Sequence, residues 1–362
     1  MRSMREAQIL CGSKLDRQIK EAFNNPTLNI SSPKQLFGAF RAEGVELEDT
    51  SEKTLSSLSD PRANLILTWR GAAKLASNVE SLLNAERDGR LYAQFNPLGT
   101  VTGRFSSKKP NLQNVTRGAL RSCFVASAPD RSLIIGDYNQ VELRVAALIA
   151  GETVMIEALK SREDLHKKIV AINLGISSAD VTEEQRTTGK AINFGLLYGQ
   201  GAKGFMNFAQ TTYGIRLPFE KAELFRANFF RTYPALAQWH KDCWQKAKDP
   251  SLGEARTVFG RLLRAQKNAP WQRFNMWTAH VVSGSCADLL KMAMVKIAVL
   301  LPGDCHLVAT VHDELIYDVP AELAEHYRHI IKGGMEESFI EMFGTTVPVQ
   351  VKAKVCSNSG EK

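Results

Sequence analysis

Two stretches decide the fold of this chain: LIIGDYNQVELR at residues 133–144 and TVHDELIYDV at residues 310–319. In each, an apolar β-type run carries an aspartate, Asp137 or Asp313, to the point where regular structure turns. A lone aspartate there is usually a turn or cap residue, and a buried carboxylate is costly unless it meets a cation. Two such acids with a basic helix between them indicate a two-metal site for phosphoryl transfer.

The surrounding pattern predicts an α+β chain. Three strand regions are expected, at residues 131–137, 307–319 and 347–355, with His312 and Asp313 at the tip of a hairpin in the second. They would form one antiparallel sheet with helices packed on one face. Helices are expected over most of residues 1–85, at 278–301 and at 322–343.

The bulk composition narrows the class of protein. With 362 residues, 44% of them hydrophobic, the chain can bury more than one core, so two or three subdomains are expected. The six cysteines are scattered without a CxxC pair, which argues against a zinc site or a disulfide framework and favours a reduced, cytosolic-type compartment. No signal-type start and no apolar run of ~18 residues occurs, so no export or membrane segment is expected.

Positive charge is concentrated in one part of the chain. The net charge is +8, but residues 186–273 hold fifteen Lys and Arg against five Asp and Glu, a net of +10. Such a block suits a polyanionic partner such as nucleic acid, although a solvated cationic face has the same composition.

The segment RTTGKAINFGLLYG, residues 186–199, supplies the basic helix. It places Arg186, Lys190, Phe194 and Tyr198 four residues apart, along one face. Two cations followed by two aromatic rings suit a nucleoside triphosphate, with the cations at the phosphates, Phe194 at the sugar and base, and Tyr198 nearest a template. Lys190 is also placed to protonate a departing pyrophosphate as a general acid.

Together, DYNQVELR, RTTGKAINFGLLYG and VHDE resemble the three sequence motifs of family A DNA polymerases, the bacterial DNA polymerase I family. TGRFSS followed by PNLQNV is similar to the primer-binding segment of that family, SPKQL to its thumb, and FFRTYP also fits. The similarity runs, in the family's order, from about residue 30 to the C-terminus.

The resemblance implies a right-hand polymerase fold with an antiparallel-sheet palm, helical fingers and a reduced helical thumb. The expected parts are a thumb at residues 1–85, a palm at 86–150 and 266–362, and fingers at 151–265 with the nucleotide helix at 186–199. Because the chain before TGRFSS is short and has no paired-acid DxE signature in residues 1–90, we expect a compact member without a proofreading exonuclease in this chain.

The same resemblance implies roles for the acidic segments. Asp137 and Asp313 would hold two catalytic Mg²⁺ ions, for which Mn²⁺ could substitute, with the Tyr138 backbone carbonyl as a further ligand. Glu314 is expected beside them as a catalytic carboxylate, and His312 at the primer terminus.

Further positions match nucleotide-binding and DNA-contacting residues of the family. Glu142 matches the steric gate, whose side chain closes the space that a ribose 2′-hydroxyl would need. Gln140 and His166 are also expected on the nucleotide side, the histidine at a phosphate, although an ordinary helix-cap residue would look the same. The residues expected to face primer and template are Arg104, Asn111, Gln113 and His312.

One part of the long helix at 278–301 departs from the family pattern. Where the family usually has an Asn and, four residues later, a Gln that inspect the minor groove, this chain has Ala279 and Ser283. Lost minor-groove hydrogen bonds would weaken mismatch sensing, so lower fidelity is a hypothesis from the sequence.

The function predicted is template-directed DNA synthesis from a primer, in replication or repair, by a magnesium-dependent nucleotidyltransferase. A single-subunit RNA polymerase could reuse both aspartates and the basic helix, but the Glu142 gate argues against ribonucleotide substrates. A non-catalytic DNA-binding remnant would be expected to lack a metal aspartate or Lys190, and none is lost. The expected partners are primer-template DNA and dNTPs, for a monomer without a membrane partner in the cytoplasm of a bacterium or phage-infected cell; an unidentified processivity factor stays open.

Overall fold

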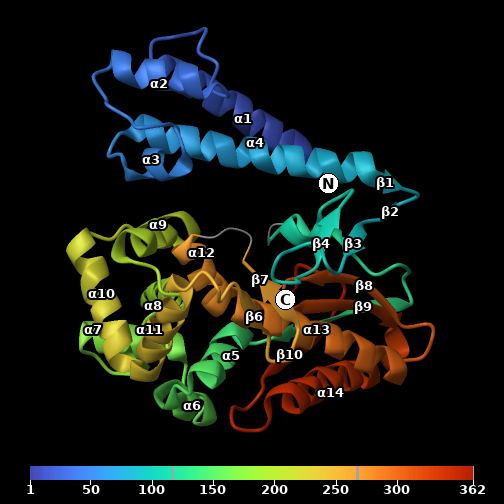
Figure 1. Ribbon diagram of the computed structural model, residues 1–362. Helices are drawn as coiled ribbons and strands as arrows, with labels where there is room; N and C mark the ends of the chain where they lie inside the picture. The colour runs from blue at the N-terminus through green and yellow to red at the C-terminus, as the bar shows by residue number, and fades with distance from the viewer. Residues whose placement is uncertain (116–117, 266–268, 362) are drawn as a thin grey trace. The chain divides into compact units, whose positions relative to one another are not determined.

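The computed structural model describes residues 1–115, 118–265 and 269–361. The chain forms two compact units (Figure 1). Unit 1 comprises Met1–Tyr92 with Met206–Leu217, and unit 2 comprises Ala93–Phe205 with Pro218–Lys362. None of the helices in these described ranges combines the length and apolar character needed to cross a bilayer.

Unit 1 is mainly helical, as the sequence predicts. Its helices are α1 (Arg2–Ala22), α2 (Pro33–Ala42), α3 (Glu52–Ser57) and α4 (Pro61–Ala85), followed by a short hairpin of β1 (Glu86–Arg87) and β2 (Arg90–Leu91). Ser32 and Asp60 cap the starts of α2 and α4, each followed by a proline in the first helical position. Helix α1 packs against α4, and a buried cluster that includes Phe23 and Phe40 forms the core.

Unit 2 is built on a four-stranded antiparallel sheet in the order β10-β5-β9-β8. The strands are β5 (Arg131–Tyr138), β8 (His306–Val311), β9 (Glu314–Pro320) and β10 (Val351–Cys356), which confirms the predicted sheet. The last strand begins four residues later than expected. Pro348 has no amide hydrogen for a ladder, and the Gln350 carbonyl accepts from Asn139 outside the strand at 2.9 Å.

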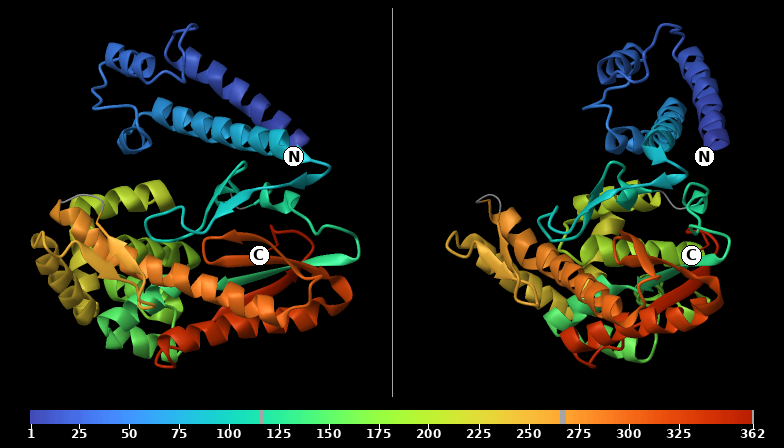
Figure 2. Two further views of the ribbon diagram at one scale, coloured as in Figure 1. Left: turned by 45° about the vertical axis from the view of Figure 1, so that its right-hand side comes forward. Right: turned by 90° about the vertical axis from the view of Figure 1, so that its right-hand side faces the viewer.

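The two faces of β5 have different neighbours. Gly136 faces α14 (Ala324–Phe343), where a Cβ would lie 2.8 Å from the Met335 sulfur, and the Tyr138 hydroxyl donates to the Met335 carbonyl at 2.7 Å. Helix α14 lies along one face of the sheet (Figure 2), and α13 (Val281–Leu300) packs on α14. Because side chains alternate along a strand, Asp137 is on the opposite face, away from α14.

The remaining helices of unit 2 fall into two groups along the chain. Between β5 and the β6–β7 hairpin lie α5 (Val141–Ala150), α6 (Thr153–Lys160), α7 (Leu165–Leu174), α8 (Glu183–Leu196), α9 (Ala202–Tyr213, shared with unit 1), α10 (Phe219–Thr232) and α11 (Pro234–Lys248). Helix α12 (Pro270–Asn275) and a π-helical turn (Met276–His280) lead into α13, so the expected long helix at 278–301 is present with an irregular start. Short 3₁₀ turns occur at Leu112–Asn114, Arg121–Cys123, Ser178–Asp180 and Ala321–Leu323, and two small hairpins pair β3 (Gln94–Asn96) with β4 (Ser106–Lys108) and β6 (Glu254–Arg256) with β7 (Leu262–Arg264).

Candidate active site

The two aspartates singled out by the sequence lie on neighbouring strands, at the same end of the sheet. Asp137 is one residue from the end of β5, and its direct cross-strand partner on β9 is Glu314. The Tyr138 amide donates to the carbonyl oxygen of Asp313 at 3.5 Å. The backbones of Asp137 and Asp313 therefore lie close together at this end of the sheet, and both residues are half-buried.

The donor set at this point fits a hard divalent cation. Within the described residues, no three His, Cys, Asp or Glu side chains are grouped to hold a metal ion. Asp137 and Asp313 supply two carboxylates, and backbone oxygens such as that of Tyr138 could add further ligands. Mg²⁺ is commonly bound through one or two carboxylates together with water and substrate phosphates, so these residues fit Mg²⁺ in that mode.

Glu314 has a different environment from the two aspartates. It is 2% exposed, and its carboxylate forms a salt bridge with Nη2 of Arg121, with Nη1 of the same side chain at 3.4 Å. Arg121 is 5% exposed, so both charges are buried and satisfy each other. This ion pair anchors Glu314 on β9, and the catalytic role expected from the sequence stays a prediction.

The hairpin tip that carries Asp313 is held by Gln113. Its Nε2 donates to the Thr310 carbonyl at 2.8 Å, and its Oε1 accepts from the His312 amide at 3.1 Å. His312 is exposed and adopts a left-handed φ of 58°. The amide of Gln113 is thus used inside the protein, whereas the sequence led us to expect it to face DNA. Asn111 is exposed, and its Oδ1 caps the Gln113 amide at 3.0 Å.

Gln113→Ala should therefore weaken the hairpin itself. Two backbone groups would lose their partner, and we expect unfolding to become easier by about 1–3 kcal/mol. Primer extension should slow with it, while the affinity for primer-template DNA should stay near wild type. Urea unfolding and gel-shift titration measure the two effects, with Asn114→Ala, at the exposed neighbour, as control. Weaker DNA binding with unchanged stability would instead support the DNA-facing role.

Three of the four residues predicted to share a helical face lie on α8 in the structure. Arg186, Lys190 and Phe194 on α8 are all partly exposed, whereas the positions between them from Gly189 to Leu196 are buried. Among the described residues, the Lys190 side chain forms no ion pair or hydrogen bond. The helix ends at Leu196, three residues before the expected end at 199, because Gly199 turns the chain with a φ of 78°. Tyr198 thus lies just beyond the helix.

Helix α7 (Leu165–Leu174) packs closely against the start of this stripe. At Gly189 a Cβ would come within 2.0 Å of the His166 carbonyl oxygen, so only glycine permits this approach. Asp164 caps α7 and accepts from Nε of Arg186 at 2.7 Å. Arg186 is thereby oriented by a carboxylate rather than extended into solvent.

His166 is 2% exposed and lies beneath Phe194, with ring centroids 5.5 Å apart. Burial lowers the pKa of His166 to about 4, so the ring is neutral at neutral pH. The Asn193 amide nitrogen donates to Nδ1 at 2.9 Å, which leaves the ring proton on Nε2. The structure therefore presents His166 as a neutral donor under Phe194 rather than as an exposed cation.

The carboxylate of Glu142, on α5, is the meeting point of three donors. Arg104 forms a salt bridge with Oε1, the Ser283 hydroxyl donates to Oε1 at 2.9 Å, and the Tyr198 hydroxyl donates to Oε2 at 2.8 Å. Burial, and then the nearby Glu142 charge, raise the pKa of Tyr198 well above its usual value, so its phenol stays protonated. Arg104, expected to face DNA, is thus bound to the expected steric gate.

Gln140 begins α5 with a left-handed φ of 54° and makes no side-chain cap. It lies between the strand end that carries Asp137 and the helix that carries Glu142. This turn sets the direction in which α5 leaves the sheet.

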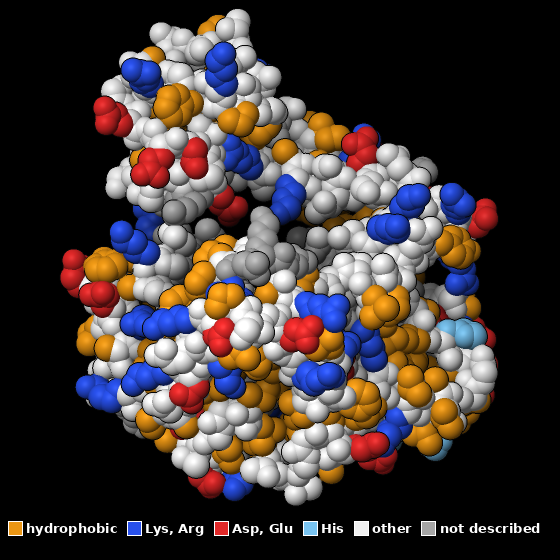
Figure 3. Space-filling model, in the orientation of Figure 1, with side chains coloured by type: hydrophobic (Ala, Val, Ile, Leu, Met, Phe, Trp, Pro, Cys, Tyr) orange, Lys and Arg blue, Asp and Glu red, His pale blue; other side chains and the backbone are white. Residues whose placement is uncertain are grey.

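On the face drawn in Figure 3, Lys and Arg side chains are spread over the surface, with Asp and Glu side chains among them.

Comparison with known proteins decides the family. The family model "DNA polymerase family A" matches residues 3–361. The chain belongs to DNA polymerase family A. DNA polymerase I of Aquifex aeolicus is 33% identical over 352 residues, which cover 94% of this chain and 60% of the relative. Thermostable DNA polymerase I of Thermus aquaticus is 30% identical, over 87% of this chain and 38% of that protein.

This family A chain also matches a solved structure. That structure is titled "POL domain of Pol1 from M. smegmatis complex with DNA primer-template and dNTP"; it has a TM-score of 0.84 and 26% identity, covering 99% of this chain and 66% of that chain. The expected α+β polymerase fold is confirmed by this match. The chain spans 60% of the length of the Aquifex relative, and less of the Thermus one.

Three contacts of this family A chain were not anticipated from its sequence. Arg121 was not singled out, because a pairing with Glu314 across 193 positions has no local signal. Ser283 was noted for the Gln it replaces, but its bond to Glu142 depends on how α13 packs on α5. Lys352 on β10 is exposed and directly opposite Asp137, a neighbour that only the strand register reveals.

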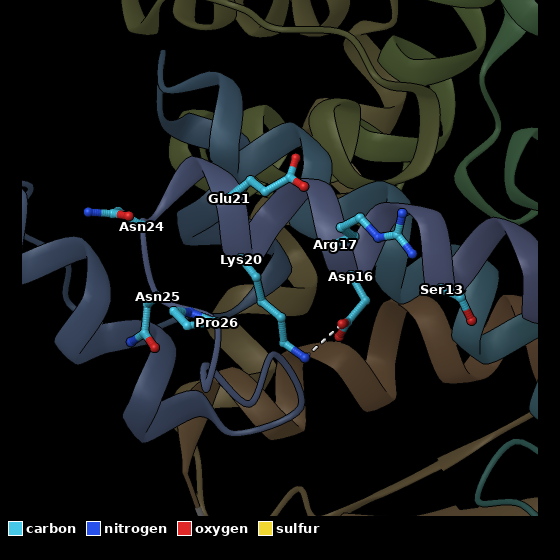
Figure 4. A pocket seen from close by; sticks show the side chains of 8 residues that line it. All are labelled: Ser13, Asp16, Arg17, Lys20, Glu21, Asn24, Asn25 and Pro26. Carbon is cyan, nitrogen blue, oxygen red and sulfur yellow. Dashed lines mark ion pairs between the residues drawn. The ribbon is translucent and has the colours of Figure 1, made fainter.

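A hollow in unit 1 does not compete with this site. It measures about 560 Å³ and is lined by residues of the second half of α1 and the turn after it, Ser13 to Pro26. Its side chains point in different directions, and Lys20 is paired with Asp16 at 2.7 Å (Figure 4). The eight labelled side chains therefore do not converge on one point where a ligand could bind.

Proposed function

We propose that this chain is a DNA-directed DNA polymerase that extends a primer 5′ to 3′ on a template with dNTPs. The observation that carries the proposal is the meeting of Asp137 and Asp313 at one end of the sheet in a family A chain. The partly exposed stripe on α8 supports it with a cationic and aromatic surface in the same unit.

The reaction we propose is nucleotidyl transfer with two Mg²⁺ ions held by Asp137, Asp313 and the Tyr138 carbonyl. When bound, such ions lower the pKa of the attacking 3′-hydroxyl and stabilise the charge on the leaving pyrophosphate. The role of the two carboxylates is to bind and orient, because their backbones are fixed by the ladder between β5 and β9.

Side chains of the α8 stripe would bind the incoming nucleotide. Lys190 Nζ is proposed to contact the phosphates and to donate a proton to the departing pyrophosphate oxygen. Arg186, held by Asp164, would meet the same phosphates, and Phe194 the sugar and base. Glu142 would exclude a 2′-hydroxyl, which favours dNTPs over rNTPs.

The test is extension of a labelled primer annealed to a longer template. We expect ordered addition of template-matched dNTPs with Mg²⁺, no extension with EDTA, and recovery when Mg²⁺ is restored. Extension without a template, or none with any dNTP, would overturn the proposal. A chain that binds primer-template DNA but never extends it would be the non-catalytic remnant.

The same assay separates the RNA polymerase alternative. On one primed template, dNTPs should be incorporated far more efficiently than rNTPs. Equal or better use of rNTPs would favour an RNA polymerase. Degradation of a 3′-mismatched labelled primer without dNTPs would contradict the expectation that this chain carries no proofreading exonuclease.

Phe194→Tyr should raise the use of dideoxynucleotides. A dideoxynucleotide lacks the 3′-hydroxyl. The hydroxyl of a tyrosine at this position can take over the hydrogen bond that is lost, and a phenylalanine ring cannot. One hydrogen bond to a charged group contributes about 1.5–3 kcal/mol, or roughly ten- to hundredfold in the ratio of ddNTP to dNTP incorporation. Chain-termination ladders measure the ratio, and Phe230→Tyr on α10 is the matched control. A ratio unchanged by Phe194→Tyr would contradict the placement of this ring at the sugar.

We further propose that the protein acts as a monomer in the cytoplasm of a bacterium or a phage-infected cell. Size-exclusion chromatography with light scattering tests the first part, and cell fractionation the second.

A further inference from the structure

Glu142 is held by donors of three kinds. Its side chain is 18% exposed, and each oxygen accepts at least one hydrogen bond. Arg104 comes from the segment after β3, Tyr198 from the turn after α8, and Ser283 from the first turns of α13. Donors on both oxygens restrict the rotation of the Glu142 carboxylate. Its orientation during the reaction therefore depends on which of the three donors stay bonded to it.

The first two donors also have proposed substrate contacts. Arg104 is 39% exposed at its side chain, and the sequence places it toward primer and template. Tyr198 is partly exposed at the end of the nucleotide stripe. Under the proposed function, substrate atoms would compete with Glu142 for both of these donors.

Ser283 differs from Arg104 and Tyr198 because it is buried inside a helix and has no proposed contact with substrate. It is 7% exposed, lies within α13, and α13 packs directly on α5, the helix that carries Glu142. Its hydroxyl has one proton to donate, and the Glu142 carboxylate at 2.9 Å can only accept. The bond therefore links two packed helices and does not depend on a mobile side chain.

We propose that Ser283 is a positioning residue that fixes Glu142 in the orientation needed to exclude ribonucleotides. This inference rests on the proposed function. The short serine reaches Glu142 directly, in the place where the family pattern has a longer amide side chain. Without the hydroxyl, Glu142 keeps only the bonds from Arg104 and Tyr198, and it can turn away from the space that a 2′-hydroxyl would occupy.

The test is the ratio of kcat/KM for a dNTP to that for the matching rNTP on one primed template. Ser283→Ala should lower this ratio about tenfold, mainly by raising rNTP use. Ser283→Cys, which keeps the side-chain size but offers only a weak donor, should fall between alanine and wild type. Melting curves show whether each variant is folded, and the cysteine variant carries the test if alanine does not fold.

Ser285→Ala is the matched control on the same helix. The Ser285 hydroxyl bonds only to backbone groups, donating to Val281 at 2.8 Å and accepting from Val258 at 3.0 Å, so its loss should leave the sugar ratio unchanged. Ratios within twofold of wild type in both Ser283 variants would overturn the inference, as would equal losses for dNTP and rNTP. A wild-type protein that extends no primer would overturn the proposed function, and the inference with it.

Discussion

Asp137→Asn and Asp313→Asn should each reduce primer extension by at least about a thousandfold. Each change removes one negative charge and a good oxygen ligand from the point where β5 and β9 meet. Metal ions in such sites contribute several kcal/mol of transition-state stabilisation, and about 4 kcal/mol corresponds to roughly a thousandfold in rate. Single-nucleotide incorporation under single-turnover conditions with Mg²⁺ measures the effect on chemistry rather than on product release.

Asp130→Asn is a suitable control, because it removes an exposed carboxylate in the turn just before β5, at the end of the strand away from Asp137. It should extend primers at the wild-type rate. Gel-shift titration of primer-template DNA in EDTA should give similar affinities for all four proteins. If either active-site variant incorporated nucleotide at the wild-type rate, the metal assignment would be wrong.

Arg121→Ala should lower the free energy of unfolding by about 3–5 kcal/mol. The change leaves the Glu314 carboxylate buried beside Asp137 and Asp313 without its cation, and breaking a buried ion pair on one side has a cost of this size. We expect primer extension to fall as well, because the strand carrying Glu314 also sets the place of Asp313. Urea unfolding followed by circular dichroism measures the stability.

The exposed pair between Arg5 and Glu80 provides the comparison. Both side chains are well exposed to solvent, at 39% and 50%, so Arg5→Ala should change stability by less than about 1 kcal/mol. Replacing both buried partners, as Arg121→Met with Glu314→Leu, should recover much of the loss, because no unpaired charge remains. A cost below 1 kcal/mol for Arg121→Ala would show that Glu314 finds another cation.

Much of the fold followed from local patterns. The apolar run before Asp137 and the hairpin around His312 each act over a few residues, so these strands were predicted within a few positions. The stripe of Arg186, Lys190 and Phe194 also appeared where the four-residue spacing put it. Errors occurred at element ends, as at Gly199, where a single left-handed residue ends a periodic pattern.

The sequence by itself determined which chemistry the chain can offer: two strand-end acids, a cationic and aromatic helix face, and their order along the chain. Only the tertiary structure decided which acid is a candidate ligand and which is a buried ion-pair partner, and that Ser283 rather than a longer side chain meets Glu142. The reason is physical. Periodicity reports the face on which a side chain lies, whereas a contact between residues 141 or 193 positions apart depends on strand register and helix packing, which no local pattern encodes.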